Sequence, residues 1–372
     1  MRWAICALVL SGCVEQLELL GAPDASVEPD AGPVLPLSAT IAVGSAQACA
    51  TKANGTAFCF GDNATGQLGL GDTNQRLIPT IVDAGTLRFA TTSVGERHAC
   101  GLTPAGAAYC WGDNSEGALG TGGNAAHLTP VKTLGQYRAL SSGDGFMCGV
   151  DFFGALSCWG RNSEGQLGQP GDVASSTPQR VGTGTYTAVA AGQGHACGLS
   201  TDAGLECWGR NTEGQVGTGS ADAQHRGPTP ALGGPWLSVS ATQGSTCAIR
   251  SDRTLWCWGE GPSLFSRTPV KVGAANDWTQ ISVNEFHFCG RRGADLYCWG
   301  RGIEGQLGLG DTDPRPDPVK VPGAWSTVAS SRFHTCGIQT DGRLYCWGKN
   351  DFDQLGLGDG MRRSSPAPVL VP

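Results

Sequence analysis

The chain has 372 residues, of which 15% are charged, and it contains 58 glycines, 21 prolines and 16 cysteines. Its formal net charge is −7, but five acids against one arginine in the first 37 residues leave only −3 for residues 38–372. A nearly neutral region of this kind has no basic stripe for phosphate contacts, so nucleic acid is excluded as an expected partner.

The N-terminus has the layout of an export signal. Residues 1–12 combine Arg2, an apolar run from Trp3 to Leu10 and small residues, as a secretory signal peptide does, although this one is short. Leu10-Ser11-Gly12-Cys13 resembles the bacterial lipobox, and the resemblance implies cleavage before Cys13 and a diacylglycerol on its sulfur. Val14, rather than Asp, follows the cysteine, which favours the outer membrane. The alternative is a mis-assigned start or a plain buried N-terminus.

Residues 13–37 follow as a tether. Pro23, Pro29, Pro33 and Pro36 are separated by small residues and acids. This composition buries too little apolar surface to fold, and proline-rich segments stay extended. We therefore expect a disordered acidic tether between the lipidated Cys13 and a folded domain at 38–372, in the cell envelope on the periplasmic side or at the cell surface.

From residue 38 onward one unit recurs seven times, with a period of about 48 residues, which is the signature of a repeat architecture. Each unit offers an opening strand, a hairpin that carries two cysteines, a glycine-rich loop and a closing strand that contains proline. The hairpin turn of the last unit is Asp341-Gly342, a strong hairpin signal. Four short strands per unit favour an all-β, seven-bladed propeller of four-stranded antiparallel blades.

The consensus makes the family resemblance specific. Gly-x-x-His-x-Cys-x-Leu followed by Tyr-Cys-Trp-Gly-x-Asn-x-x-Gly-Gln-Leu-Gly resembles the regulator of chromosome condensation repeat over residues 38–372. The resemblance implies a seven-bladed propeller. The six Cys-Trp-Gly tryptophans and Phe60 hold one repeat position, so we expect them to pack between blades rather than to form an aromatic cage.

Unit five departs from this pattern. After Trp258-Gly259 it continues Glu260-Gly261-Pro262-Ser263-Leu264 and lacks the Gln-Leu-Gly element. We therefore expect a shortened loop in this blade and a gap on one face of the ring.

The cysteines recur in pairs that span a predicted hairpin, so the two members of a pair lie opposite each other at a separation that suits a disulfide. Their spacing does not fit a metal site, and free structural thiols are the other alternative. Because export provides an oxidising compartment, we predict seven disulfides: Cys49–Cys59, Cys100–Cys110, Cys148–Cys158, Cys197–Cys207, Cys247–Cys257, Cys289–Cys298 and Cys336–Cys346.

The sequence offers no reaction motif, whether a nucleophile elbow, a phosphate loop or a zinc-protease signature. His98, His195, His287 and His334 share one repeat position, and we interpret them as structural braces. The Leu-Gly-Asp segments at 70–72, 309–311 and 357–359 lack the alternating ligands of a calcium loop. We therefore predict no catalytic residue, no metal and no cofactor.

The segments after the Gln-Leu-Gly element vary most between units, and variable loops on a rigid scaffold are common recognition surfaces. They span 72–78, 120–129, 169–177, 218–229, 311–317 and 358–367. The candidate binding residues there are Arg76, His127, His225, Arg226, Arg315, Arg362 and Arg363; ordinary solvated loop residues are the alternative interpretation.

These patterns favour a non-catalytic, exported, lipid-anchored interaction module that binds a protein or cell-envelope ligand through propeller loops. We expect a monomer that touches the membrane through its lipid alone. One alternative is a guanine-nucleotide-exchange regulator like the family namesake, which export would oppose. Another is a propeller enzyme, a hydrolase or lyase acting on polysaccharide, which would need paired acids that converge at the central channel.

Overall fold

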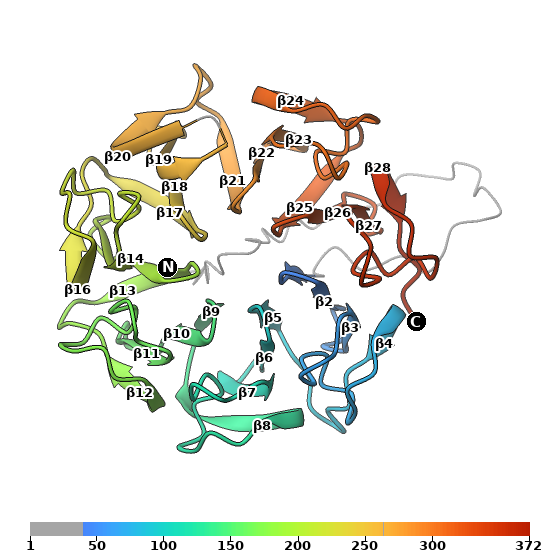
Figure 1. Cartoon of the computed structure of the whole chain (residues 1–372), viewed down its shortest axis with the longest axis horizontal. Coiled ribbons are helices and arrows are strands. Elements are labelled where there is room, and N and C mark those ends of the chain that lie inside the picture. The colour runs from blue at the N-terminus through green and yellow to red at the C-terminus, as the bar shows by residue number, and fades with distance from the viewer. Residues whose placement is uncertain (1–39, 263) are drawn as a thin grey trace, which may run out of the picture.

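The computed structural model describes residues 40–262 and 264–372, which form 28 strands in seven four-stranded sheets. Each sheet is an antiparallel meander of consecutive strands, and the sheets stand around a central axis with the first strand of each blade innermost (Figure 1). The predicted seven-bladed propeller is confirmed. The predicted signal peptide, Cys13 and the tether lie outside the described residues.

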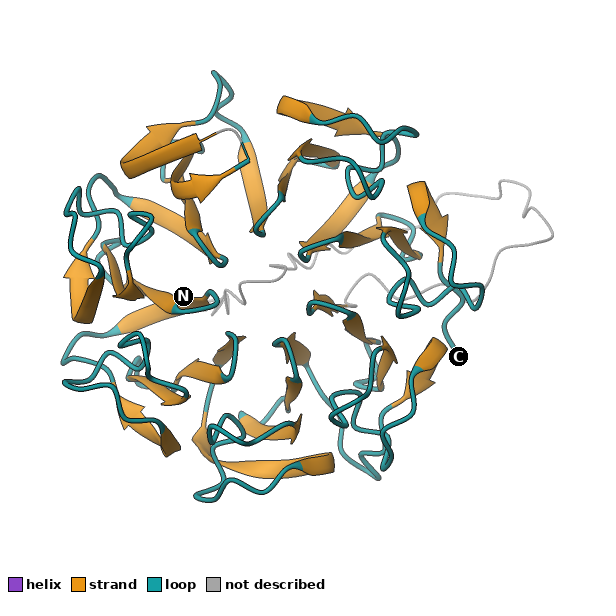
Figure 2. Ribbon diagram, viewed as in Figure 1, coloured by secondary structure: helices purple, strands orange, loops and turns teal. Residues whose placement is uncertain are grey.

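The strands of the first four blades are β1 (Thr40–Val43), β2 (Gln47–Thr51), β3 (Ala57–Gly61), β4 (Arg76–Ile81); β5 (Thr91–Val94), β6 (His98–Leu102), β7 (Ala107–Gly112), β8 (His127–Gln136); β9 (Ala139–Ser142), β10 (Phe146–Val150), β11 (Leu156–Gly160), β12 (Ser175–Arg180); β13 (Tyr186–Ala191), β14 (His195–Ser200), β15 (Leu205–Arg210) and β16 (Gln224–Pro230). Those of the last three are β17 (Trp236–Ala241), β18 (Ser245–Arg250), β19 (Leu255–Gly261), β20 (Leu264–Lys271); β21 (Trp278–Val283), β22 (His287–Arg292), β23 (Asp295–Gly300), β24 (Arg315–Val321); β25 (Trp325–Ser330), β26 (His334–Gln339), β27 (Leu344–Gly348) and β28 (Arg363–Pro368). Loops join the strands throughout (Figure 2). In the described part of the chain, no helix has the length and apolar character that crossing a bilayer requires.

The hairpin register places the two cysteines of each unit opposite each other, as Cys197 pairs with Cys207 between β14 and β15. Each blade contains one disulfide, between the two cysteines of the predicted pair, with Cα–Cα distances of 4.0 to 4.2 Å. The cysteines are buried in the cores. Disulfides of this number belong to oxidising compartments, and they therefore indicate an extracytoplasmic location.

The tryptophans of the Cys-Trp-Gly elements join neighbouring blades. Trp208 is fully buried, and its Nε1 donates a hydrogen bond to the backbone carbonyl of Gln166 in the preceding blade at 2.9 Å. The same bond of 2.9 Å recurs for Trp111 to Gln67, Trp159 to Ala118, Trp258 to Gln215 and Trp347 to Gln306. In each case the acceptor belongs to the Gln-Leu-Gly element or its variant, so this element locks one blade to the next. These five indoles therefore have the inter-blade packing role that the sequence predicted.

The outer strands begin earlier than the apolar pattern suggests: sequence places the closing strands of units four and seven near 230–232 and 368–371, but β16 and β28 span Gln224–Pro230 and Arg363–Pro368. Their first residues are polar, and the first or second of them pairs with the glycine of Cys-Trp-Gly, as Arg363 does with Gly348. Three residues after this position each outer strand carries a proline: Pro79, Pro130, Pro178, Pro228, Pro269, Pro318 and Pro366. Proline removes an N–H from an exposed edge and so protects the rim from pairing with other strands.

The ring closes without exchange of strands, because blade one is wholly N-terminal and blade seven wholly C-terminal. Gln75 donates from Nε2 to the carboxylate of Asp353 at 2.6 Å, and the Gly358 N–H donates to the Leu77 carbonyl at 2.9 Å. Phe60 takes the tryptophan position and packs against Leu355 of blade seven in one core cluster. The closing interface therefore keeps the apolar packing of the others and the loop-to-strand backbone bond, but it has no indole hydrogen bond because the Phe60 side chain carries no N–H.

Removing one disulfide should weaken the fold measurably. Cys197 and Cys207 are separated by 10 positions, and in the chain-entropy model a loop of this length is worth about 3 kcal/mol. We expect the Cys197→Ala/Cys207→Ala variant to lose about this much free energy of unfolding in non-reducing urea titrations. An unchanged free energy, or 14 alkylatable cysteines in the unreduced protein, would contradict the assignment.

Candidate interaction site

Two connections in each blade vary in sequence, the turn between the first and second strands and the loop between the third and fourth, and both emerge on one side of the ring. Since the strands alternate in direction, the turn between the first and second strands lies on the same face as the loop between the third and fourth; we call this the loop face. At its centre the first turns of all seven blades surround a cavity of about 170 Å³ at the mouth of the channel.

The structure does not bring the sequence-predicted binding residues together. In five different blades the glycine of Cys-Trp-Gly, or of Cys-Phe-Gly in blade one, pairs with one of these residues: Arg76, His127, His225, Arg315 or Arg363. They hold one repeat position around the rim, four of them as the first residue of an outer strand and His225 as the second of β16. Arg226 also lies in β16 and Arg362 directly precedes β28. Six of the seven therefore lie in outer strands and not in loops as predicted, whereas Arg362 lies in a loop as predicted.

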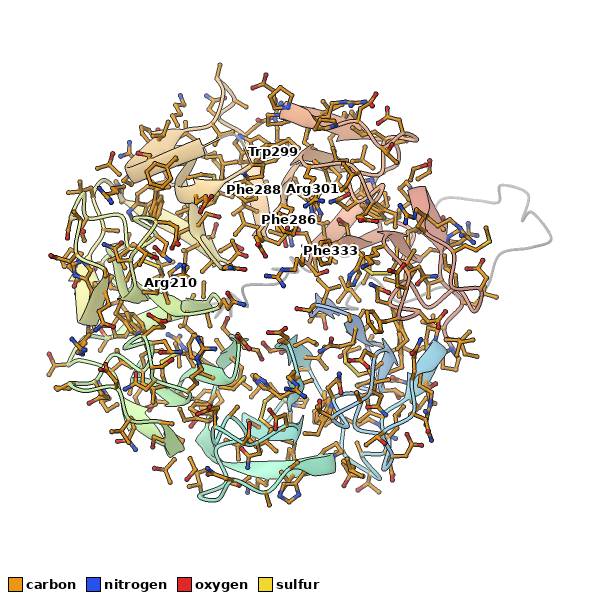
Figure 3. All side chains as sticks on the ribbon, viewed as in Figure 1. Arg210, Phe286, Phe288, Trp299, Arg301 and Phe333 are labelled. Carbon is orange, nitrogen blue, oxygen red and sulfur yellow. A yellow bond between two sulfur atoms is a disulfide. The ribbon has the colours of Figure 1, made fainter. Side chains whose placement is uncertain are left out.

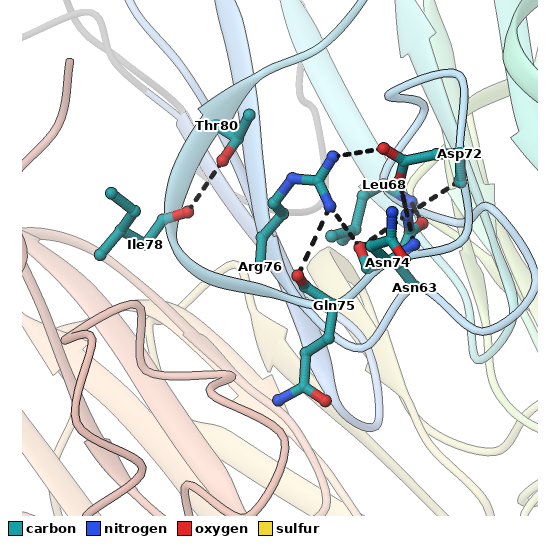
Figure 4. Close-up of polar contacts among 8 residues, drawn as sticks. All are labelled: Asn63, Leu68, Asp72, Asn74, Gln75, Arg76, Ile78 and Thr80. Atoms are coloured by element: carbon teal, nitrogen blue, oxygen red, sulfur yellow. Dashed lines mark hydrogen bonds and ion pairs between the residues drawn. The ribbon is translucent and has the colours of Figure 1, made fainter.

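Most of these arginines are engaged in contacts within the propeller. Arg76 pairs with Asp72 at 2.7 Å (Figure 4). The same pairing joins Arg315 to Asp311 at 2.6 Å and Arg363 to Asp359. The hydrogen bond from Arg76 lowers the pKa of Asp72. The acids are those of the Leu-Gly-Asp segments, which therefore hold turns as interpreted. Between blades, Arg226 pairs with Asp172 at 2.9 Å and Arg362 with Glu304 at 3.3 Å.

The four repeated histidines are buried, and His195 and His287 brace neighbouring blades. His195 Nε2 lies 2.8 Å from Thr246 Oγ1, and His287 Nε2 lies 2.6 Å from Thr335 Oγ1, each in the next blade. Gln47 fills this position in blade one and donates to the carbonyls of Gly95 and Glu96 at 3.0 Å. Burial lowers the pKa of His195, His287 and His334 to about 3 and that of His98 to about 4.

Blade five leaves the gap that its sequence predicts. β19 ends at Gly261 and β20 already begins at Leu264, so blade five has no room for the loop that carries Gln-Leu-Gly elsewhere. A pocket of about 650 Å³ opens between blades five and six on the loop face. We call it the notch and define it by Glu260, Pro262, Phe286, Arg301, Ile303 and Pro316.

Phe288 of blade six fills the deep end of this gap. The other blades have Ala, Met or Thr at its repeat position. Its ring packs edge-on against Trp299 at 5.8 Å (Figure 3), and a Cβ on Gly261 would lie only 2.8 Å from it. Trp299 is 4% exposed, and no described carbonyl accepts from its Nε1. The shallow end of the gap stays open.

A cluster that does not repeat lies between the channel mouth and the notch. Phe286 and Phe333 occupy the first turns of blades six and seven, where the other blades have Ala, Arg or Gly, and their rings lie 5.4 Å apart (Figure 3). Arg301 lies 4.8 Å from the Phe286 ring and Lys349 5.1 Å from the Phe333 ring. Arg332 lies 6.0 Å from both rings and pairs with Glu285.

Two acids also meet at the channel mouth. Glu96 and Asp144 line it from blades two and three, and Asp144 pairs with Arg161 at 3.0 Å. Burial and the neighbouring Asp144 carboxyl raise the pKa of Glu96. Glu96 and Asp144 lie four residues before the first cysteine of their units, and Glu285 and Arg332 hold the same position in units six and seven. Aligning the units there would have exposed this non-repeating set, which the sequence reasoning missed.

The buried histidines should make the fold sensitive to acid. Histidine in the unfolded chain titrates near 6.5, whereas the folded pKa values lie at about 4 or below. The unfolded state therefore binds more protons below pH 6.5, and stability present above that pH is lost as pH falls, by at most about 1.4 kcal/mol per pH unit for each histidine. Urea titrations between pH 7 and pH 4 measure this slope.

The matched variant is His195→Gln, which installs the residue that blade one uses at this position. The free energy of unfolding of this variant should fall less steeply with decreasing pH than that of the wild type, by the contribution of one histidine. A slope equal to that of the wild type would show that His195 does not titrate on unfolding.

Comparisons with known proteins agree with this architecture. Profiles of the regulator of chromosome condensation (RCC1) repeat match residues 54–102, 154–199, 294–338 and 341–372, and also 89–118, 186–215 and 325–354. The Arabidopsis thaliana ultraviolet-B receptor UVR8 is 34% identical over 93 residues, which are 25% of this chain and 21% of the receptor. The chain thus spans a minor part of this curated relative.

Solved structures share the fold. The structure of Prp20p from Saccharomyces cerevisiae has a TM-score of 0.74 at 21% identity, covering 84% of this chain and 85% of Prp20p. Human WBSCR16 has a TM-score of 0.71 at 21% identity, covering 78% and 83%. At this identity the likeness concerns the fold alone. Because the repeat profiles together match more than half of the residues, and the units they match build the blades, the chain belongs to the RCC1 repeat family.

Proposed function

We propose that this RCC1-repeat propeller is an exported, lipid-anchored protein-interaction module that performs no catalysis. It binds a protein or cell-envelope ligand through its loop face. The export signal, the lipobox at Cys13 and the seven disulfides support the location. The tether lets the propeller stand away from the membrane.

The observation that carries the binding role is the cluster around Phe286 and Phe333. A packing role in a repeat protein recurs from blade to blade, as the Cys-Trp-Gly indoles do, whereas this cluster occurs in two blades only. Aromatic residues and arginine are enriched in the contact centres of protein interfaces. Phe286 and Phe333 are half-buried and lie beside both the channel mouth and the notch, so a ligand there would contact a surface unlike the rest of the ring.

Cross-linking in intact cells, followed by purification of the chain, tests the proposal. We expect wild-type protein to capture a defined envelope protein and the Phe286→Ser/Phe333→Ser variant to lose most of this capture, since the two rings supply the apolar contact area. Cys13→Ala should release the chain from the membrane fraction while keeping its folded state. Equal capture by wild type and the double variant would refute the role of the loop-face cluster.

A second candidate function has one observation in its favour. Glu96 lies beside Asp144 at the channel mouth, and carboxyl pairs with separated protonation states serve glycoside hydrolysis. Cleavage of a polysaccharide by the wild type that disappears in Glu96→Gln would favour a propeller enzyme over the binding module.

Nucleotide exchange is the remaining alternative. The work on Prp20p concerns its binding to Gsp1p and histones, and this chain shares the fold with that protein. A cytoplasmic location in cell fractionation would favour exchange, and a membrane-fraction location would favour the interaction module.

A further inference from the structure

The notch lacks a backbone contact that most inter-blade interfaces have. At five interfaces an N–H of the loop after the third strand donates to a carbonyl in the next outer strand at 2.9 Å: Gly71 to Leu128, Gly122 to Ser176, Gly219 to Arg267, Gly310 to Ser364 and Gly358 to Leu77. Between blades three and four the Arg226–Asp172 ion pair takes its place. The equivalent carbonyl between blades five and six is that of Pro316, and no described N–H outside its own sheet donates to it.

The walls of the notch define what would fit beside this acceptor. Phe286, Pro262 and Ile303 provide an apolar floor, and Ile303 is 45% exposed. Glu260 at the rim is exposed and has no ion-pair partner among the described residues. A complementary group therefore offers a backbone N–H, an aliphatic side chain and a cation. An extended peptide provides all three.

We propose that the notch binds a loop of a partner protein that carries an aliphatic side chain next to a lysine or arginine. The loop would stand where the other blades place their own Gln-Leu-Gly segment. Its N–H would donate to the Pro316 carbonyl, its aliphatic side chain would pack on Phe286 and Ile303, and its cation would pair with Glu260. This inference rests on the proposed interaction module and names its binding site and ligand class.

The volume agrees with such an occupant. Because Phe288 already fills the deep end, the remaining space of about 650 Å³ lies within the range of sites that hold a few side chains. The notch also adjoins the channel mouth, since Gln243 and Glu285 line both. A bound loop would thus continue onto the cluster of Phe286 and Phe333.

Selection from a phage-displayed library of random peptides on the immobilised full-length chain tests the inference. We expect enrichment of sequences with an aliphatic residue beside Lys or Arg. Glu260→Lys should lower the affinity of the tightest-binding peptide at least tenfold. Replacing the Lys or Arg of that peptide with Glu should restore binding to the variant. Ile303→Asp should weaken it similarly.

Glu116→Lys is the matched control, since Glu116 is an exposed acid on the loop of blade two, where the Gly122 N–H bond to Ser176 is present. Its affinity should equal that of the wild type, and all variants should melt within a few degrees of it. Peptides whose affinity ignores both notch substitutions, or a failure to enrich any peptide, would overturn the site. Self-association of the wild type that Ile303→Asp abolishes would also overturn it, because the occupant would then be a second copy. None of these results depends on capture of a cellular partner, so failure of the notch and failure of the interaction module remain distinguishable.

Discussion

The structure depends on one joint that repeats around the ring. At five of the seven interfaces, a backbone carbonyl of the Gln-Leu-Gly segment or its variant, in the loop after the third strand, accepts from the tryptophan indole of the next blade. The indole ring packs in the interface and its N–H is hydrogen-bonded there. A large apolar surface is therefore buried without leaving an unsatisfied donor. A four-stranded blade of this size has too little core to stand alone, and the joint supplies the missing half of that core.

The joint also explains why blade five is different. Without its loop, the interface would have an empty deep cavity beside Trp299, and a cavity of that kind costs several kcal/mol. Phe288 replaces the small residue found elsewhere and fills that space. No described residue covers the shallow part to the same degree, and the notch remains. The missing loop thus leaves an open surface at this interface, next to the only aromatic pair that we find among the described first turns.

The sequence predicted the fold because the signals that set it are strictly periodic. Cysteine spacing, Cys-Trp-Gly and the Asp341-Gly342 turn each specify local pairing, and the absent element of unit five predicted the gap. The outer strands were placed less well, since their first residues are polar and are held by register rather than by burial. The candidate site was missed for a related reason. Arg76, Arg315 and Arg363 look variable along the chain, but each has a carboxylate four residues earlier. Phe286 meets Phe333, and Glu96 meets Asp144, only when neighbouring blades pack side by side, although alignment of the units would have marked their positions.

Exchange of the indole N–H protons, followed by NMR on protein labelled with ¹⁵N-tryptophan, tests the inter-blade joint most directly. Trp111, Trp159, Trp208, Trp258 and Trp347 should all exchange slowly, because each indole donates to the preceding blade. Trp299 should exchange faster than these five. Protection of Trp299 equal to theirs would mean that the joint between blades five and six is complete, and it would contradict this account of the ring and its open side.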